Sequence, residues 1–268
     1  MSGLPGMQVS RIWKVSEINF VFPEGFSFFE PYLEYHIKET LEIGGEAYLC
    51  TTSERTVAGI FIYDEFEKVG TVYTKSRPVF DYFYQLKQFD FLFSEMRTEL
   101  ENEIYDIYTI NLEISSVAHR FSHEISIAEE SHLDEVERFM VSTQPGMNRR
   151  WVNVALKNGD KCFFVKLGPE IVALGWLSLV NNVGRLHSLY VKPQFRRIGI
   201  GEDILNARLL WLKSKHASWA FTEIARSNIA SSGNVMKAHM NASGQVLQYF
   251  KKSLSKERTE SSKSQSMF

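Results

Sequence analysis

The chain has 268 residues, of which 44% are hydrophobic and 13% aromatic, enough for two domains with sizeable cores. A net charge of only −2 excludes the strongly basic surface of a nucleic-acid-binding protein, and no apolar run is long enough to cross a bilayer. The segment Met1–Met7 lacks the regions of a signal peptide, and Cys50 and Cys162 have no metal-ligand spacing. We therefore expect a cytoplasmic protein with reduced, mostly buried thiols that binds neither metal, membrane nor nucleic acid.

The N-terminal half contains most of the chain's Phe and Tyr residues together with a mixture of helix and strand patterns. Helices are predicted over Phe28–Ile43 and Val79–Lys87. Strands are predicted at Ala47–Thr51, Val57–Tyr63, Lys68–Thr74 and Ile104–Leu112.

A polar stretch, Ser115–His123, indicates a domain boundary. We expect one α/β domain over residues 1–122, a second over residues 123–252, and a disordered Ser/Lys/Glu-rich tail over residues 253–268. Ser131–Asp134 has the pattern of a capping box that opens a helix through Met140.

The rest of the second domain alternates between the two element types. Further helices are predicted at Arg149–Lys157, Gly201–Lys215 and Gly233–Asn241, and strands at Glu124–Glu129, Lys161–Lys166, Ile171–Val180, Arg185–Val191, Trp219–Ala225 and Gln245–Lys251. This order predicts an α/β layout around a mixed sheet flanked by helices. The N-terminal half follows a blurred version of the same order, with Gly59 and Gly175 near the start of corresponding strands, so two tandem copies are predicted.

The segment Val191–Gly201, Val-Lys-Pro-Gln-Phe-Arg-Arg-Ile-Gly-Ile-Gly, joins a predicted strand to a predicted helix. The first backbone N–H groups of a helix have no intrahelical partners and lie at the positive end of its dipole, where a pyrophosphate binds well. Gly199 and Gly201 let the backbone approach the phosphates closely. The dinucleotide fingerprint requires a third glycine where the chain has Ile204, and the P-loop requires Gly-Lys-Ser/Thr, so both are excluded.

The pattern Val191, Pro193, Arg196, Gly199 and Gly201 resembles the acyl-coenzyme A loop of the GNAT family of N-acetyltransferases, and the element order over residues 123–252 is similar too. The resemblance implies acetyl-CoA as co-substrate and a small-molecule or peptide amine as acceptor, with a homodimer as a possible assembly. The alternative is an ordinary strand-to-helix turn. The residues expected to contact the co-substrate are Leu189, Tyr190, Val191, Arg196, Arg197, Ile198, Gly199, Ile200, Gly201, Glu202 and Asn228.

Two residues are candidates for proton transfer. His187 lies on the strand before the loop, and an imidazole titrates near neutral pH; alternatively it only packs in the sheet. Glu223 lies in an apolar strand, where a carboxylate is costly unless it is paired or functional; alternatively it forms a salt bridge with Arg185 or Arg226. Many family members carry a Glu where this chain has Arg185, which leaves the base open.

The resemblance is incomplete on the last predicted helix. The segment Ser231–Gly244 has no Tyr to act as the acid toward the departing sulfur, although a thiolate leaves tolerably without one. A non-catalytic acyl-CoA sensor or adaptor is therefore the alternative function, and a structural protein without a cofactor is the third.

The N-terminal half has no paired glycines at the corresponding place, Gly70–Pro78, so one coenzyme A site per chain is expected. Its aromatic residues are expected to form a core of their own; alternatively some of them line the acceptor pocket. These residues are Phe26, Phe28, Phe29, Phe80, Tyr82, Phe83 and Tyr84.

Overall fold

The computed structural model describes residues 4–17, 22–24, 26–65, 68–86, 89–98, 103–117, 120–143 and 149–251. The tail predicted over residues 253–268 lies outside the described residues. The described helices are α1 (Glu30–Glu42), α2 (Arg77–Leu86), α3 (Leu133–Thr143), α4 (Arg149–Lys157), α5 (Ile200–Ser214) and α6 (Ile229–Lys237). The strands are β1 (Met7–Ile12), β2 (Glu46–Thr52), β3 (Val57–Asp64), β4 (Val69–Tyr73), β5 (Phe91–Ser94), β6 (Glu103–Asn111), β7 (Ser126–Ile127), β8 (Lys161–Leu167), β9 (Glu170–Val180), β10 (Val183–Val191), β11 (Trp219–Ala225) and β12 (Asn241–Lys251).

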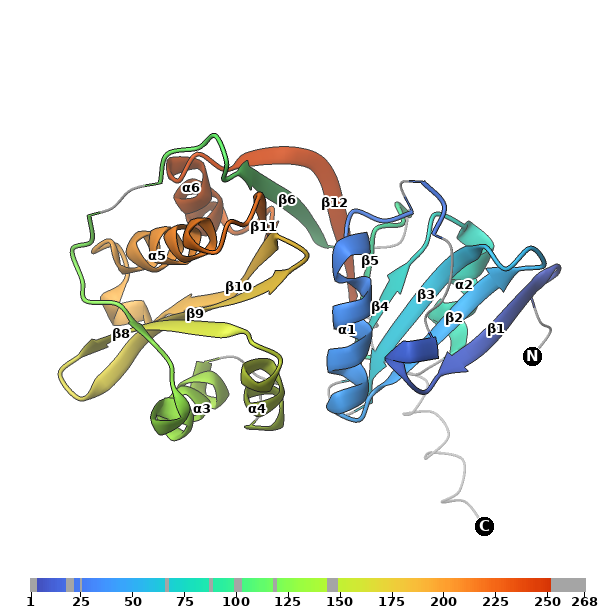
Figure 1. Cartoon of the computed structure of the whole chain (residues 1–268), viewed down its shortest axis with the longest axis horizontal. Coiled ribbons are helices and arrows are strands. Elements are labelled where there is room, and N and C mark those ends of the chain that lie inside the picture. Colours follow the sequence, from blue (N-terminus) through green and yellow to red (C-terminus); the bar gives the residue numbers. More distant parts are fainter. Residues whose placement is uncertain are drawn as a thin grey trace, which may run out of the picture.

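All described strands form one mixed sheet in the order β1-β2-β3-β4-β5-β12-β6-β11-β10-β9-β8-β7. Figure 1 shows two lobes, with the helix α1 of the N-terminal half standing at their junction. The predicted α/β class and mixed sheet are confirmed. No helix among the described ranges is both long and apolar enough for a membrane span.

The two halves repeat the same unit. Each has three antiparallel strands, a helix and a parallel fourth strand, as β2-β3-β4-α2-β5 and as β8-β9-β10-α5-β11. In both copies a glycine lets the helix lie close to the sheet: a Cβ on Gly59 would come within 2.5 Å of Val79, and one on Gly175 within 3.1 Å of Ile204. The predicted tandem arrangement is confirmed.

The last strand of each half lies against the other half. The strand β6 pairs with β11, whereas β12 crosses back to pair with β5, and β6 and β12 pair with each other at the centre of the sheet (Figure 1). The boundary between residues 122 and 123 stays a prediction, and β6 and β12 pair across it. Because each half supplies a strand to its neighbour, the halves cannot separate without breaking the sheet.

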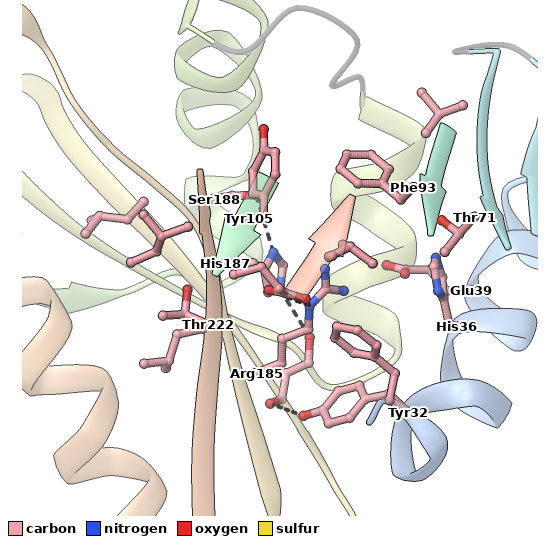
Figure 2. Close-up of a pocket in the computed structure, with 18 of the residues that line it drawn as sticks. Tyr32, His36, Glu39, Thr71, Phe93, Tyr105, Arg185, His187, Ser188 and Thr222 are labelled. Carbon is pink, nitrogen blue, oxygen red and sulfur yellow. Dashed lines mark hydrogen bonds and ion pairs between the residues drawn. The ribbon is translucent and has the colours of Figure 1, made fainter. Parts of the chain in front are cut away.

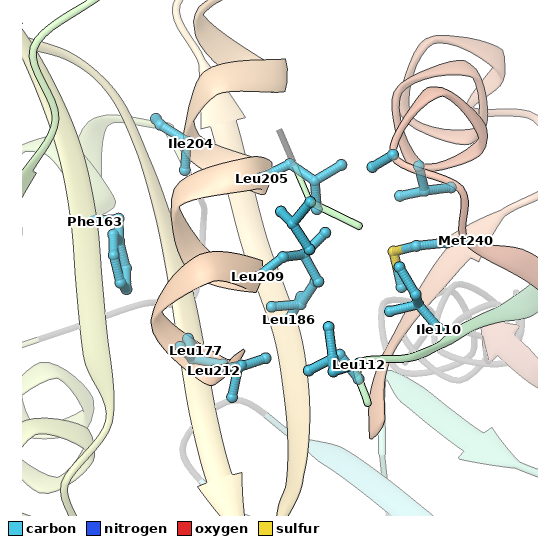
Figure 3. Packing of buried hydrophobic residues seen from close by; sticks show 14 of the residues in the cluster. Ile110, Leu112, Phe163, Leu177, Leu186, Ile204, Leu205, Leu209, Leu212 and Met240 are labelled. Carbon is cyan, nitrogen blue, oxygen red and sulfur yellow. The ribbon is translucent and has the colours of Figure 1, made fainter. Parts of the chain in front are cut away.

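The helix α5 covers the sheet of the C-terminal half. Its residues Leu205, Leu209 and Leu212 pack against Leu186 of β10 and against Ile110 of β6 (Figure 3). The N-terminal half therefore contributes a strand to the core on which α5 rests, and this core fixes where the N-terminus of α5 lies.

The aromatic residues of the N-terminal half belong to two clusters. Phe80 and Phe83 of α2 are buried in a core of that half, with Tyr82 and Tyr84 packed against it, as expected. Other aromatic residues pack on the C-terminal half instead: Phe28, Phe29 and Tyr32 each contact Phe221 of β11, with ring centroids 5.3–5.6 Å apart.

Phe221→Ala is expected to lower the free energy of unfolding by about 3–5 kcal/mol, since it removes a ring that is 3% exposed and leaves a cavity. Chemical denaturation should show one transition shifted as a whole, because the halves share strands. Trp219→Ala on the same strand, where the side chain is 47% exposed, is the control and should cost at most about 1 kcal/mol. Two separate transitions, with only one of them shifted, would contradict this account.

Several boundaries differ from the sequence predictions. The capping box is formed by Glu129 and His132 around a short 3-10 turn, and not by Ser131–Asp134. Helix α6 begins four residues before the predicted Gly233, because the Asn228 side chain accepts a hydrogen bond from the Ser231 N–H and caps the helix. The strands β1 and β5 were not predicted.

Candidate functional site

The strands β10 and β11 separate partway along their length. They pair in parallel only where Val183–Arg185 meets Trp219–Phe221. Beyond this point β11 stays bonded to β6, while β10 stays bonded to β9. This leaves a slot between β10 and β11 from Leu186 onward. In the N-terminal half the corresponding parallel pair holds through Val69–Val72, nearly the whole of β4, and no such slot opens.

A bulge turns β10 beside this slot. The register of β10 with β9 shifts between His187 and Tyr190, and Ser188 takes a positive φ of 51°. Past the bulge, the N–H of Lys192 donates to the Val172 carbonyl of β9. Because successive backbone groups of a strand point to opposite sides, Val191 and Leu189 direct theirs toward the slot.

The loop that follows β10 reaches α5 through a left-handed turn. Gly199, at φ 92°, is the N-cap residue of α5, and Arg197 has φ 65°. At Gly201, a Cβ would lie 3.2 Å from the Asn234 side-chain nitrogen of α6. The exposed residues Ile198, Gly199, Arg197 and Arg196 surround the helix N-terminus, and Ile200 is buried in the core. These conformations fit a backbone cradle for an anion, with glycine where closeness is required.

The side chains around the loop are held in place. The Arg196 Nε donates to the Val191 carbonyl at 2.9 Å, so this guanidinium folds back on β10. Glu202 forms an ion pair with Lys237 of α6 at 3.4 Å. Asn228 caps α6 and lines the slot from the other side. The sequence-predicted residues of the loop and of α6 are thus brought together around one helix end.

The slot opens into a cavity of about 820 Å³ whose walls come from both halves (Figure 2). From the C-terminal half it is lined by β10 and β11, by Leu205 and Arg208 of α5, and by Ser231, Asn234 and Val235 of α6. From the N-terminal half it is lined by one face of α1 and by β3, β4 and β5, with Phe29 and Tyr73 among the lining residues. Phe29 thus lines a cavity shared with the C-terminal half, and the identity of this cavity as the acceptor pocket stays a prediction.

His187 lies on the cavity wall at the end of a hydrogen-bonded chain. Ser178 Oγ donates to buried Asp160 at 2.9 Å, and Tyr35 of α1 donates to the same carboxylate at 2.6 Å. His187 Nε2 lies 3.1 Å from Ser178 Oγ. Because the Ser178 proton is directed to Asp160, the imidazole is the donor in this contact, which leaves Nδ1 as its acceptor nitrogen, 3.3 Å from Ser188 Oγ.

Burial sets the charge states of this chain of groups. Desolvation raises the pKa of Asp160 to about 6. Burial, together with the charges of Arg185 and Arg208, lowers the pKa of His187 well below that of a free imidazole. His187 is therefore neutral at neutral pH, in the form that can accept a proton.

Glu223 is paired with Arg185 of the neighbouring strand, with Arg185 Nε 3.0 Å from one carboxylate oxygen and 3.4 Å from the other. This is the salt bridge considered from the sequence; Arg226 pairs with Asp106 instead. Both members of the Arg185–Glu223 pair line the cavity. They place a neutralised ion pair at the point where β10 and β11 begin to separate.

Arg208 was not identified from the sequence. Its side chain is 2% exposed, and Nη1 donates to the carbonyls of Trp176 at 2.9 Å and His187 at 3.3 Å, the residues that face each other just before the bulge. Burial lowers the pKa of Arg208 to about 9. The sequence did contain a signal for Arg208, because this charged residue lies at helical spacing between the apolar residues Ile204 and Leu212. Asp160 gave no such signal, because it follows Asn158-Gly159 and resembles a turn residue.

Among the described residues, no group of three or more His, Cys, Asp or Glu side chains could hold a metal ion. Cys50 and Cys162 are both buried and free of disulfide bonds, as expected.

Comparison with known proteins shows which family and which solved structures this chain is similar to. A model of the Acetyltransferase (GNAT) family matches residues 125–233. No curated protein matches the chain in sequence. The tandem GNAT protein of the clavulanic acid biosynthesis pathway has a similar fold, with a TM-score of 0.59 at 8% identity over 91% of this chain and 98% of that one.

Two further solved structures agree over both halves. A Drosophila protein gives a TM-score of 0.58 at 12% identity, over 88% of this chain and 92% of that chain. A GNAT-family acetyltransferase from Colwellia psychrerythraea gives 0.53 at 11% identity, over 90% and 98%. At these identities the likeness shows the fold alone. The C-terminal half of this chain is therefore a domain of the GNAT acetyltransferase family, joined to an N-terminal half of similar layout.

Proposed function

We propose that the protein is an acyl-CoA-dependent N-acetyltransferase that acetylates a primary amine through a single site in the C-terminal half. One observation carries the proposal: the slot between β10 and β11 begins at the glycine-rich end of α5 and ends in a cavity shared by both halves. A pyrophosphate group, an extended arm and a reacting thioester require these three features in this order.

The residues of the slot would hold acetyl-CoA along its length. The backbone from Arg197 to Glu202 would bind the pyrophosphate, and Leu189 and Val191 would pair with the arm. Asn228 would contact the arm from the α6 side. The bound molecule would supply an acetyl group activated as a thioester.

His187 would take the proton of the acceptor ammonium at Nδ1, so that the amine nitrogen can attack the thioester carbonyl carbon. The C–N bond forms and the C–S bond breaks, and the second proton lost by the nitrogen passes to the departing thiolate, giving an amide and the coenzyme A thiol. A backbone N–H at the bulge, near Leu189 or Tyr190, would stabilise the negative carbonyl oxygen. Arg208 would keep this donor in place, because it bonds the carbonyl that precedes the bulge.

The pH dependence of kcat follows from the neutral state of His187. A lowered pKa means that the proton-accepting form of His187 persists as the pH falls through 6.5, so its imidazole should contribute no inflection near 6.5 to kcat with both substrates saturating. Initial rates from pH 6 to pH 8 would check this. An inflection near 6.5 that disappears in His187→Gln would show that the imidazole titrates normally and would contradict the expectation.

Calorimetric titration of the full chain with acetyl-CoA tests the proposed site. One molecule bound per chain is expected, since a slot and a glycine-rich turn occur together only in the C-terminal half of the described chain. No binding would reject both the acetyltransferase and the acyl-CoA sensor. Two bound molecules would show that the N-terminal half also binds.

A further inference from the structure

The cavity wall contributed by α1 carries a carboxylate that has no role in the proposed transfer. Tyr32, His36, Glu39 and Ile43 follow one another at helical spacing along one face of α1, and all four line the cavity. Figure 2 shows Tyr32, His36 and Glu39 reaching from α1 toward the residues of β10.

Glu39 differs from the other acidic groups of this region in having no partner. Asp160 accepts hydrogen bonds from Tyr35 and Ser178, and Glu223 is paired with Arg185. For the Glu39 carboxylate, by contrast, no hydrogen bond or ion pair is formed with any residue in the described ranges.

The neighbouring basic groups do not neutralise Glu39. Arg185, whose charge acts on it, is held by Glu223. His36 bonds the Tyr73 hydroxyl at 2.8 Å, and burial lowers the pKa of His36 to about 3, so its ring is uncharged. Desolvation, together with the nearby charge of Asp160, raises the pKa of Glu39 to about 7, and the charge of Arg185 opposes this rise only in part.

Aromatic rings line the same cavity as this carboxylate. Those that line the cavity are Phe29, Tyr32, Tyr35, Tyr73, Phe93, Tyr105 and Trp151. Aromatic faces attract cations, and the attraction grows when water is excluded. A carboxylate without a partner, set among such rings, is suited to an ammonium group.

The reacting nitrogen cannot be this ammonium group. It would lie beside His187 on β10 of the C-terminal half, whereas Glu39 projects from α1 of the N-terminal half. Building on the acetyltransferase function, we propose that the acceptor is a diamine or polyamine, and that Glu39 binds the ammonium group that is not acetylated. The N-terminal half then sets the substrate preference of a reaction performed by the C-terminal half.

The test compares kcat/KM for 1,4-diaminobutane, butylamine and 4-aminobutanoate in the full chain. The wild type should prefer the diamine by about tenfold or more over the other two. Glu39→Gln keeps the shape but removes the charge, so it should erase most of this preference and leave the value for butylamine within about twofold. Glu34→Gln, at an exposed position of the same helix, is the matched control and should change neither value.

The inference would be overturned if Glu39→Gln lowered kcat/KM equally for 1,4-diaminobutane and butylamine, or if the wild type preferred 4-aminobutanoate. Acetyl-CoA titration of each variant separates this outcome from failure of the proposed function, in which acetyl-CoA does not bind. If turnover is too slow to measure, calorimetry of 1,4-diaminobutane with the protein–coenzyme A complex decides. Binding that Glu39→Gln abolishes supports the inference, and no binding by the wild type refutes it.

Discussion

Replacing Gly199 and Gly201 together by glutamate is expected to weaken acetyl-CoA binding by about a hundredfold or more. Gly199, with φ 92°, holds a conformation that L side chains rarely adopt, and a Cβ at Gly201 would crowd the Asn234 side chain. Two carboxylates would also stand where the pyrophosphate charge is expected, and such like-charge contacts cost several kcal/mol. Calorimetric titration measures the effect.

The control for this variant is Gly168→Glu. Gly168 also has a positive φ, 63°, and open space around it, but it lies in the turn between β8 and β9. It should suffer similar backbone strain and still bind acetyl-CoA normally. Undiminished binding by the double glutamate variant would show that the end of α5 does not hold the phosphates.

His187→Gln is expected to lower kcat by about a hundredfold, because positioned acid–base groups contribute about 10²–10⁴-fold. The KM for acetyl-CoA should stay unchanged, since the side chain faces the acceptor side of the bulge. Ser178→Ala keeps the imidazole but removes its Nε2 partner, and a smaller loss, about threefold to tenfold, is expected. Steady-state kinetics with both substrates varied would separate these effects.

A kcat within about threefold of the wild type in His187→Gln would reassign His187 to packing. In that case the ring serves as a neighbour of Trp151, whose ring centroid lies 6.1 Å away. A water molecule would then take the proton from the acceptor ammonium.

The local features of the C-terminal half were predictable because they depend on nearby residues. The strand Arg185–Val191, the turn at Gly199 and the helix predicted to end at Lys215 all follow from periodicity and glycine placement. The start of α6 was predicted late, because Ile229 and the serines after it have modest helix propensity and the Asn228 cap was not recognised.

The cavity itself was not predictable from local patterns. Glu39 and Arg208 are far apart in the sequence and line one cavity only because the fold brings α1 and α5 to it. The pairing of β6 with β11 and of β12 with β5 likewise joins strands that lie far apart in the sequence. It involves short strands, such as Phe91–Ser94, whose sequence alone does not specify a neighbour.

The most direct test of the central proposal is release of coenzyme A thiol from acetyl-CoA by the full chain, measured with and without a panel of primary amines. The proposed acetyltransferase predicts thiol release that depends on the amine, with the acceptor gaining the mass of one acetyl group. Acetyl-CoA binding without amine-dependent release for any amine in the panel would contradict catalysis and favour the acyl-CoA sensor.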